Sequence, residues 1–200
     1  MKLDDQLAQL ASIGLTLDPG ITIEDLIYSS GRQAYEERPF DLILFVLGIE
    51  VEREPWGRPI CSRVWNFDTK CIYGSGDYVA IAKRLCVLAG KPDAFSDVVD
   101  HVDIAHSEAW LKYKVGGTSL DIKAKVDGHW VDAMVVHDVM FDLEYDRRSG
   151  PSAFRASNEQ TWRFYGRDNG SAKVLFYLDD EAAAAVNRWS GNALHPLMPE

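Results

Sequence analysis

The chain has few cysteines, no long hydrophobic run and no basic N-terminus, and each shortage excludes a class of protein. Its three cysteines, Cys61, Cys71 and Cys86, are an odd number at spacings that fit no metal motif. They are typical of a reducing compartment. The longest apolar run, residues 42–47, is far too short to cross a bilayer, and the first ten residues carry acids where a signal peptide carries bases. We therefore expect a soluble, cytoplasmic protein with no membrane partner.

Basic residues are also in the minority. The chain has 31 acidic and 21 basic residues, with a net charge of −10. Nucleic acid is an unsuitable partner, because phosphate binding needs a basic face. A basic protein partner is compatible with this charge, since opposite fields speed encounter. Selection for solubility alone would also explain an acidic surface.

What the chain does contain is an alternating segment between residues 107 and 132. Apolar and polar residues alternate in residues 111–115 and again in residues 120–126, as in strands with one buried face. Gly116-Gly117 lies between these runs and suits a two-residue turn with positive φ. The pattern predicts an antiparallel hairpin whose apolar face must be covered.

A second hairpin is predicted near the C-terminus. Residues 162–165 and 172–178 resemble strands, and Asn169-Gly170 between them is a strong hairpin dipeptide. We expect a type I′ turn with positive φ at both Asn169 and Gly170. Asp179 and Asp180 then cap a helix over residues 181–189.

Helices are predicted elsewhere by apolar spacing and end signals, over residues 3–13, 22–28, 40–47 and 78–89. Residues 131–145 fit both a helix and a strand, and we favour the helix. Residues 49–53 suggest a short strand, residues 91–107 a polar connection, and residues 147–160 a polar loop.

This order of elements predicts an α+β fold. A helical N-terminal third, about residues 1–48, precedes a part, about residues 49–200, with a mixed or antiparallel sheet built from hairpins. Helices are expected on one face of that sheet. Two hundred residues favour a single domain over residues 1–200.

Histidines and carboxylates gather in DHVDIAH, residues 100–106, and these are groups that zinc, iron or manganese bind. His101, Asp103 and His106 are the candidate ligands. The spacing is not HExxH, and no third ligand can be named beside the two histidines. A solvated acidic loop explains the segment better, so we expect no metal and no cofactor.

Other catalytic patterns are missing or incomplete. GxSxG is absent, which removes the α/β-hydrolase elbow. GSGDY, residues 74–78, lacks the lysine of a phosphate loop, and Asp77 would repel a phosphate at the helix start. Cys86 lies on an apolar helical stripe, where burial raises the pKa of a thiol. No catalytic residue is predicted.

The segment EVEREPW carries the one surface pattern that suggests binding. Period 2 places the carboxylates of Glu50, Glu52 and Glu54 on one side of an extended chain, beside Trp56. Charges on an edge strand also protect against aggregation, which is the structural explanation. Acids around an exposed tryptophan suit a cationic protein surface, so these four residues are the predicted partner-binding site.

Two parts of the chain, residues 40–90 and 162–191, resemble uncharacterised bacterial cytoplasmic proteins, some of them similar to the immunity proteins that neutralise interbacterial toxins. They contain FDLILFVLGIEVE, WNFDTKCIYGSGDYVAIAKRLCVLAG and WRFYGRDNGSAKVLFYLDDEAAAAVNRWSG. The resemblance implies an acidic immunity factor for a basic toxin, and it assigns no residue a role. The sequence thus favours a non-enzymatic protein-binding protein. The alternatives are a metal-assisted hydrolase using the His101–His106 segment and a structural or regulatory module.

Overall fold

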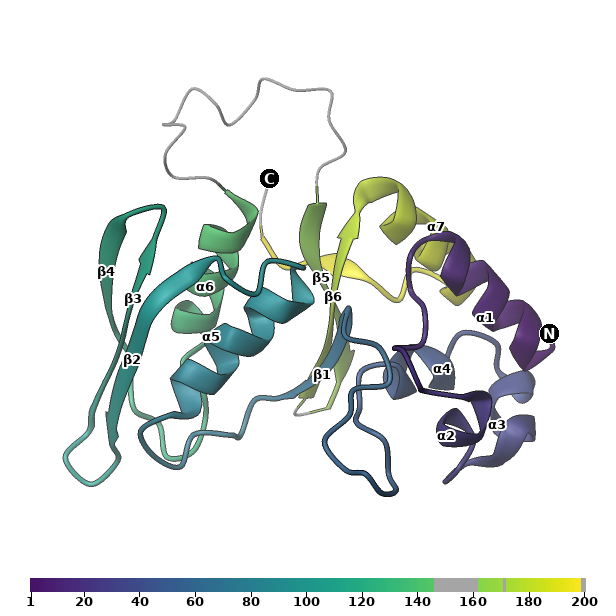
Figure 1. Cartoon of the computed structure of the whole chain (residues 1–200), viewed down its shortest axis with the longest axis horizontal. Coiled ribbons are helices and arrows are strands. Elements are labelled where there is room, and N and C mark those ends of the chain that lie inside the picture. The colour runs from purple at the N-terminus through teal and green to yellow at the C-terminus, as the bar shows by residue number, and fades with distance from the viewer. Residues whose placement is uncertain (146–161, 171, 199–200) are drawn as a thin grey trace. The chain divides into compact units, whose positions relative to one another are not determined.

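The computed structural model describes residues 1–145, 162–170 and 172–198 (Figure 1). The chain divides into two compact units. Unit 1 is Met1–Phe67 with Gln160–Leu197, and unit 2 is Asp68–Glu159 with Met198–Glu200. The α+β prediction is confirmed, including its helical N-terminal part and its helices packed on sheets. The single domain over residues 1–200 stays a prediction, and each unit is described by itself.

Unit 1 combines the N-terminal helices with a four-stranded sheet in the order β1-β6-β5-β7. Its helices are α1 (Leu3–Ser12), α2 (Ile23–Leu26), α3 (Gly31–Glu37), α4 (Leu42–Val46) and α7 (Asp180–Ser190). Its strands are β1 (Val64–Asp68), β5 (Trp162–Asn169), β6 (Ala172–Asp179) and β7 (His195–Pro196).

The helices of unit 1 are tied together by a buried glutamine on α1. The Gln6 amide donates to the Tyr35 carbonyl at 2.9 Å and accepts from the Phe40 backbone N–H at 2.9 Å. Phe40 has φ of 63°, and its ring stacks on Trp189 with centroids 5.4 Å apart. Gln6 thereby satisfies backbone groups at a strained position that would otherwise be buried without partners.

Strand β6 is buried over most of its length. Five consecutive residues, Val174 to Leu178, are buried. Val174, Phe176 and Leu178 belong to the core shared with the helices. Tyr177 lies on the opposite face, stacked on Trp162 at 5.7 Å between ring centroids. A continuous apolar run of this kind marks a strand with both faces covered.

Unit 2 contains helices α5 (Asp77–Leu88) and α6 (Ala133–Glu144) and a sheet in the order β2-β3-β4. Its strands are β2 (Phe95–Asp103), β3 (Glu108–Val115) and β4 (Thr118–Lys123), and both strand pairs are antiparallel. Both helices lie on one side of the sheet (Figure 1). The Tyr113 hydroxyl, on that side, donates to the buried Asp142 carboxylate of α6 at 2.6 Å.

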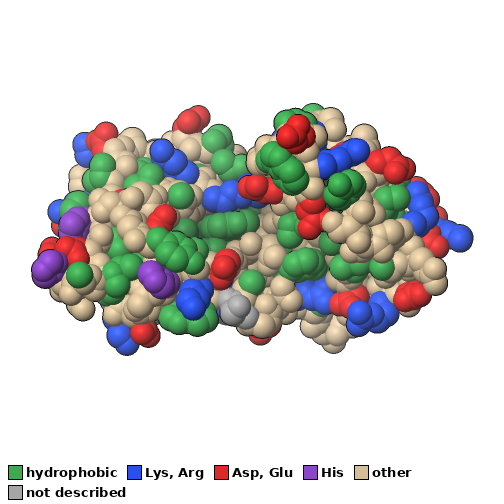
Figure 2. Space-filling view, turned by 90° about the horizontal axis from the view of Figure 1, so that it is seen from below, with side chains coloured by type: hydrophobic (Ala, Val, Ile, Leu, Met, Phe, Trp, Pro, Cys, Tyr) green, Lys and Arg blue, Asp and Glu red, His purple; other side chains and the backbone are tan. Residues whose placement is uncertain are grey.

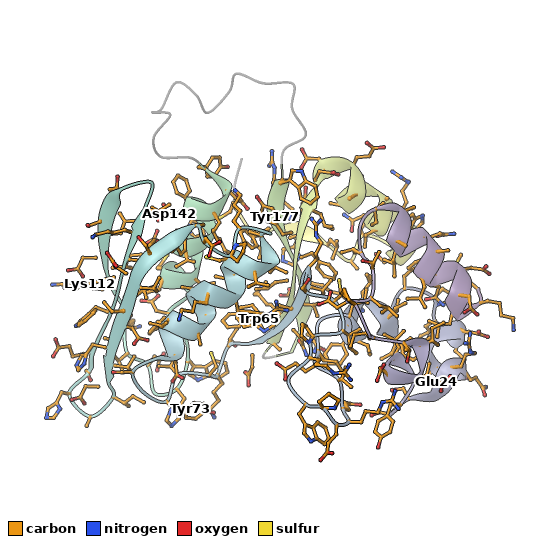
Figure 3. The ribbon with its side chains drawn as sticks, viewed as in Figure 1. Glu24, Trp65, Tyr73, Lys112, Asp142 and Tyr177 are labelled. Carbon is orange, nitrogen blue, oxygen red and sulfur yellow. The ribbon has the colours of Figure 1, made fainter. Side chains whose placement is uncertain are left out.

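The predicted central hairpin is confirmed. Val115 pairs with Thr118 across Gly116-Gly117, whose φ values are 56° and 86°. Ala109, Leu111 and Tyr113 are buried, whereas Lys112 points away from α5 and α6 (Figure 3). The helix favoured over residues 131–145 is also confirmed as α6.

The polar connection predicted over residues 91–107 is wrong, because β2 fills most of it. Asp100 explains the polar sequence, since its carboxylate caps α5. It accepts from the backbone N–H groups of Gly76, Tyr78 and Val79 at 2.6, 2.9 and 3.2 Å. A carboxylate from a neighbouring strand therefore occupies the anion position of the GSGDY turn.

Two further predictions need correction. The strand over residues 49–53 is reduced to an isolated bridge between Glu50 and Pro59. In the second hairpin Asn169 is still a strand residue paired with Ala172, so the turn begins at Gly170, whose φ is 62°. The type I′ assignment at Asn169-Gly170 was thus placed one residue too early. The predicted loop over residues 147–160 lies outside the described residues.

No helix within the described ranges has the length and apolar content needed to span a membrane.

Candidate functional site

The predicted partner-binding residues lie on one closed loop of unit 1. The Val51 N–H donates to the Arg58 carbonyl at 2.9 Å, and the Ile60 N–H donates to the Ile49 carbonyl at 3.0 Å. These bonds close the base of the loop, and Trp56 projects from it with 65% of its surface exposed. The indole is therefore carried on a backbone that is tied at both ends.

A buried carboxylate beneath the loop holds it to the helical layer. Arg53 Nε and Nη2 each lie 2.7 Å from Asp25 Oδ1, and Arg58 Nη2 lies 3.9 Å from the same atom. Asp25 Oδ2 accepts from the Thr22 N–H at 2.8 Å and hydroxyl at 2.9 Å, forming a capping box at the start of α2. Arg53 is thus fixed on the start of α2, and Arg58 lies within ion-pair distance of the same carboxylate.

Hydrogen bonds lower the pKa of Asp25 to about 2. The Arg53 guanidinium has the largest effect, and the Thr22 backbone N–H comes next. Burial of the carboxyl acts in the opposite direction and is outweighed. The carboxylate is therefore ionised at neutral pH, where it pairs with Arg53.

The three glutamates are on the solvent side of the loop. Glu50, Glu52 and Glu54 are exposed, while Val51 between them is buried. Glu52 accepts a hydrogen bond from the Ser29 hydroxyl, which brings the α2–α3 connection against the loop. The period-2 prediction for the carboxylates thus has the expected exposure, although the segment is not a regular strand.

We call this region the Trp56 surface. It includes residues of the loop and of α2 with its flank, namely Glu24, Tyr28, Glu50, Glu52, Glu54 and Trp56. Tyr28, next to Ser29, is 60% exposed and is a second aromatic side chain here. Glu24 lies on α2 beside Asp25 and is labelled in Figure 3.

The charge of this surface is negative because its arginines are already engaged. Among the described residues, none of Glu50, Glu52 and Glu54 is in an ion pair, whereas Arg53 and Arg58 both turn toward Asp25. Figure 2 shows acidic and basic side chains interleaved over the face that it draws. A local acidic area with exposed aromatics can bind a cation, and it offers no nucleophile.

The candidate metal ligands lie in unit 2 and do not converge. His101 is on β2, where its ring stacks on Trp110 with centroids 5.7 Å apart. His106 Nδ1 lies 2.7 Å from Asp103 Oδ2, and the hydrogen bond raises the pKa of His106 and lowers that of Asp103. Within residues 1–145, 162–170 and 172–198 there is no group of three His, Cys, Asp or Glu side chains that could hold a metal.

The cysteines do not form a nucleophilic site. Burial raises the pKa of Cys71 and that of Cys86 to about 11 each, so both are thiols at neutral pH. Cys61 is buried in the core of unit 1.

Unit 1 also has a cavity of about 330 Å³ beside α3, α4 and the β5–β6 hairpin. Its two arginines are both bound to one carboxylate. Arg38 lies 3.0 Å from Asp41 Oδ2, and Arg167 donates to the Asp41 carbonyl at 2.7 Å and pairs with its carboxylate. One carboxylate thus holds both guanidinium groups, and Glu37 and Asp168 add two further acids to the lining.

The sequence argument predicted the exposed residues of this surface and missed the contact that lies beneath them. Asp25, Arg53 and Tyr28 were not predicted to act there. The capping-box spacing of Thr22 and Asp25 was a usable signal, as was an arginine set between two glutamates. What joins them is a contact between residues 28 positions apart, which no local pattern shows.

The chain matches no protein-family model, no curated protein and no solved structure.

Proposed function

We propose that this chain is a non-enzymatic protein-binding protein whose Trp56 surface docks a cationic protein. The observation that carries the proposal is Trp56, two-thirds exposed on a loop anchored to the buried Asp25. We further propose that it serves as an immunity factor, which neutralises a basic toxin in a bacterial cytoplasm. The free state of all three cysteines is compatible with that compartment.

An exposed tryptophan on an ordered loop suits protein binding for two reasons. Tryptophan is among the residues that contribute most to interface energy, since its large flat side chain fills a pocket on the partner. A loop held in place before binding loses little conformational entropy on docking. The Arg53–Asp25 contact supplies that order here.

The surrounding glutamates set the choice of partner. Rim charges act mainly on the association rate, and like charges on a wrong partner weaken the encounter. Glu50, Glu52 and Glu54 therefore favour a partner with lysine or arginine around an apolar pocket. The metal-assisted hydrolase remains an alternative from the sequence alone, and no contact among the described residues favours it.

Photo-crosslinking in the native host provides the first test. A benzophenone amino acid at position 56 should capture one predominant partner with a high isoelectric point. The same group at position 130, another exposed tryptophan but in unit 2, is the matched control and should not capture it. An acidic partner would contradict the charge argument.

Binding kinetics with the captured partner provide the second test. Trp56→Ala should weaken binding about 30-fold or more through faster dissociation. The triple change Glu50→Gln, Glu52→Gln and Glu54→Gln should slow association about tenfold at low salt and flatten its salt dependence. Trp130→Ala should bind as the wild type does.

The toxin part is tested separately by co-expression. The captured partner should inhibit growth when expressed alone, and the wild-type chain should restore growth where Trp56→Ala does not. If Trp56→Ala and the triple glutamate variant both bind the partner with wild-type rates, the docking face lies elsewhere. A captured partner that does not inhibit growth would contradict the immunity role and would not affect the proposed docking face.

A further inference from the structure

The two outer edges of the unit 2 sheet differ in whether another strand can pair with them. The edge at β2 is blocked. The outward N–H of Val102 donates to the Ser75 hydroxyl at 3.0 Å. The strand also breaks register between Ser96 and Val99, around Asp97 with φ of 52°. A capped amide and a bulge are two of the ways in which proteins prevent a second chain from pairing with an edge.

The edge at β4 is open. The two-residue turn makes Val115 and Thr118 a hydrogen-bonded pair, so the even-numbered residues of β4 direct their amides toward β3. The Ala124 N–H continues this pattern by donating to the Ala109 carbonyl at 2.9 Å. The amides and carbonyls of Ser119, Asp121 and Lys123 therefore point outward.

Within the described residues, β4 has a strand neighbour on one side only. The outward amide of Lys125, just beyond the strand, is capped by Asp132 Oδ2 at 2.6 Å. The open part of the edge is therefore short, and it carries outward-facing groups that another strand can pair with.

We propose that β4 pairs antiparallel with β4 of a second copy of this chain, with Ile122 on the two-fold axis. In this register Asp121, which already pairs with Lys112 of β3 at 2.9 Å on one side, faces Lys123 of the second copy on the other. The symmetric contact repeats this arrangement. Opposite charges directly across an antiparallel pair are favourable. The pairing makes one continuous six-stranded sheet from two three-stranded ones.

Charge favours this register over the symmetric ones next to it, and a register on Lys123 would place the two Lys123 side chains against each other. With Asp121 on the axis, the two Asp121 side chains face each other, which is unfavourable. With Leu120 on the axis, Asp121 faces Ser119 and Lys123 passes beyond the end of the second β4. Only the register on Ile122 matches both charges of the edge.

The inner face supports the same choice. Leu120 and Ile122 are half-buried apolar residues at the edge of the sheet, on the side of Leu111 and Tyr113. Pairing on Ile122 brings the two Ile122 side chains together in a non-hydrogen-bonded position, where Cα atoms are about 4.5 Å apart. The contact is much smaller than a standard interface, so the dimer is weak.

A cysteine on the axis reports the register directly. Ile122→Cys should form an intermolecular disulfide in a glutathione redox buffer, because its Cα separation across the axis suits that bond. Leu120→Cys, on the same face of the same strand, faces Ala124 of the second copy and should form at least about fivefold less dimer. The wild type in the same buffer accounts for Cys61, Cys71 and Cys86.

A charge reversal then separates pairing from chance collision. Lys123→Glu in the Ile122→Cys background should lower the dimer yield about threefold or more, since Asp121 would face a glutamate. Lys83→Glu on α5 changes the net charge equally at an exposed residue outside the sheet, so it should leave the yield unchanged. Equal yields from the two reversals would overturn the proposal.

Sedimentation velocity covers a failure of the cysteine variants to fold. The weight-average sedimentation coefficient of the wild type should rise toward that of a dimer as concentration approaches about 1 mM, and that of Lys123→Glu should not. A wild type that stays monomeric throughout, or Leu120→Cys that crosslinks as well as Ile122→Cys, would show that β4 is a protected edge and not a docking strand.

Discussion

The sheets of the two units face solvent in different ways. In unit 1, β6 has five consecutive buried residues, so both faces of the strand are covered. In unit 2, β3 alternates between buried residues such as Leu111 and Tyr113 and solvent-facing ones such as Lys112 and Lys114. One sheet is an interior element, and the other is part of the molecular surface.

This difference determines where each unit can present a binding group. A sheet buried on both faces leaves recognition to the segments around it, and in unit 1 the Trp56 loop is fixed to the helical layer through Asp25. A sheet with one solvent-exposed face and an unpaired edge can instead bind through its backbone hydrogen-bonding groups. The proposed β4 pairing uses these groups. Side-chain recognition is therefore expected in unit 1 and backbone recognition in unit 2.

The comparison can be tested most strongly by the same truncation in both sheets. Leu178→Ala in β6 removes a side chain that is fully buried in the core, and we expect a loss of about 3–4 kcal/mol in the free energy of unfolding. Leu120→Ala in β4 removes a half-buried side chain and should cost about 1 kcal/mol. Urea unfolding followed by circular dichroism measures both. Equal losses would mean that the two sheets are buried alike.

Replacing a turn glycine with valine should destabilise the two hairpins by similar amounts, although their sheets differ in how much they are exposed to solvent. Gly117→Val and Gly170→Val each place a β-branched residue at positive φ, with φ of 86° and 62°, and each should cost about 1–2 kcal/mol. Neither change meets another atom within 4 Å, so the loss reports backbone strain. Gly74→Val is the matched control, because it is equally unhindered and has no positive φ. A variant that melts with the wild type would show its turn to be wrongly placed.

Acid should affect the anchor of unit 1 more than the exposed ion pair of unit 2. The pKa of Asp25 is about 2 in the folded chain against an ordinary 3.8. Its stabilising contribution is complete above pH 4 and is lost as pH falls toward 2. Arg53→Gln removes the largest cause of the shift, so the urea midpoints of wild type and variant should differ at pH 5 and converge near pH 2.

The exposed pair provides the control for this measurement. The pKa of His106 is raised by Asp103, so any contribution of the protonated histidine is present below its ordinary pKa of 6.5 and is lost as pH rises. His106→Ala should shift the midpoint less than Arg53→Gln does at pH 5, since exposed pairs contribute little. The reverse order would mean that Asp25 does not anchor the loop.

The elements predicted correctly are those whose own periodicity specifies them. The Gly116-Gly117 hairpin, the helix over residues 131–145 and the α+β class follow from local alternation, spacing and turn residues. Strand β2 was missed because its polar residues serve other elements. Asp100 caps a helix, and Asp97 lies in a bulge that interrupts the alternation.

The site shows the same limit. The exposure of Glu50, Glu52 and Glu54 agrees with the period of 2 that the sequence predicts for their carboxylates. The support did not follow, because Arg53 reaches a carboxylate that belongs to α2. The pairing of β1 with β6 is likewise absent from any local pattern, since more than a hundred residues separate the two strands in the sequence.

That interrupted arrangement has a consequence during synthesis. A ribosome adds about 5–20 residues per second, so β1 emerges roughly 5–20 s before β6 is made. During this interval the apolar side chains of Ile43, Leu44 and Leu47 lack the β6 residues that they pack with in the core. The segment Asp68–Glu159 is meanwhile synthesised without interruption. The helices and strands of unit 2 can therefore form before unit 1 has all of its strands, and the apolar core residues of the N-terminal helices stay uncovered by β6 until then.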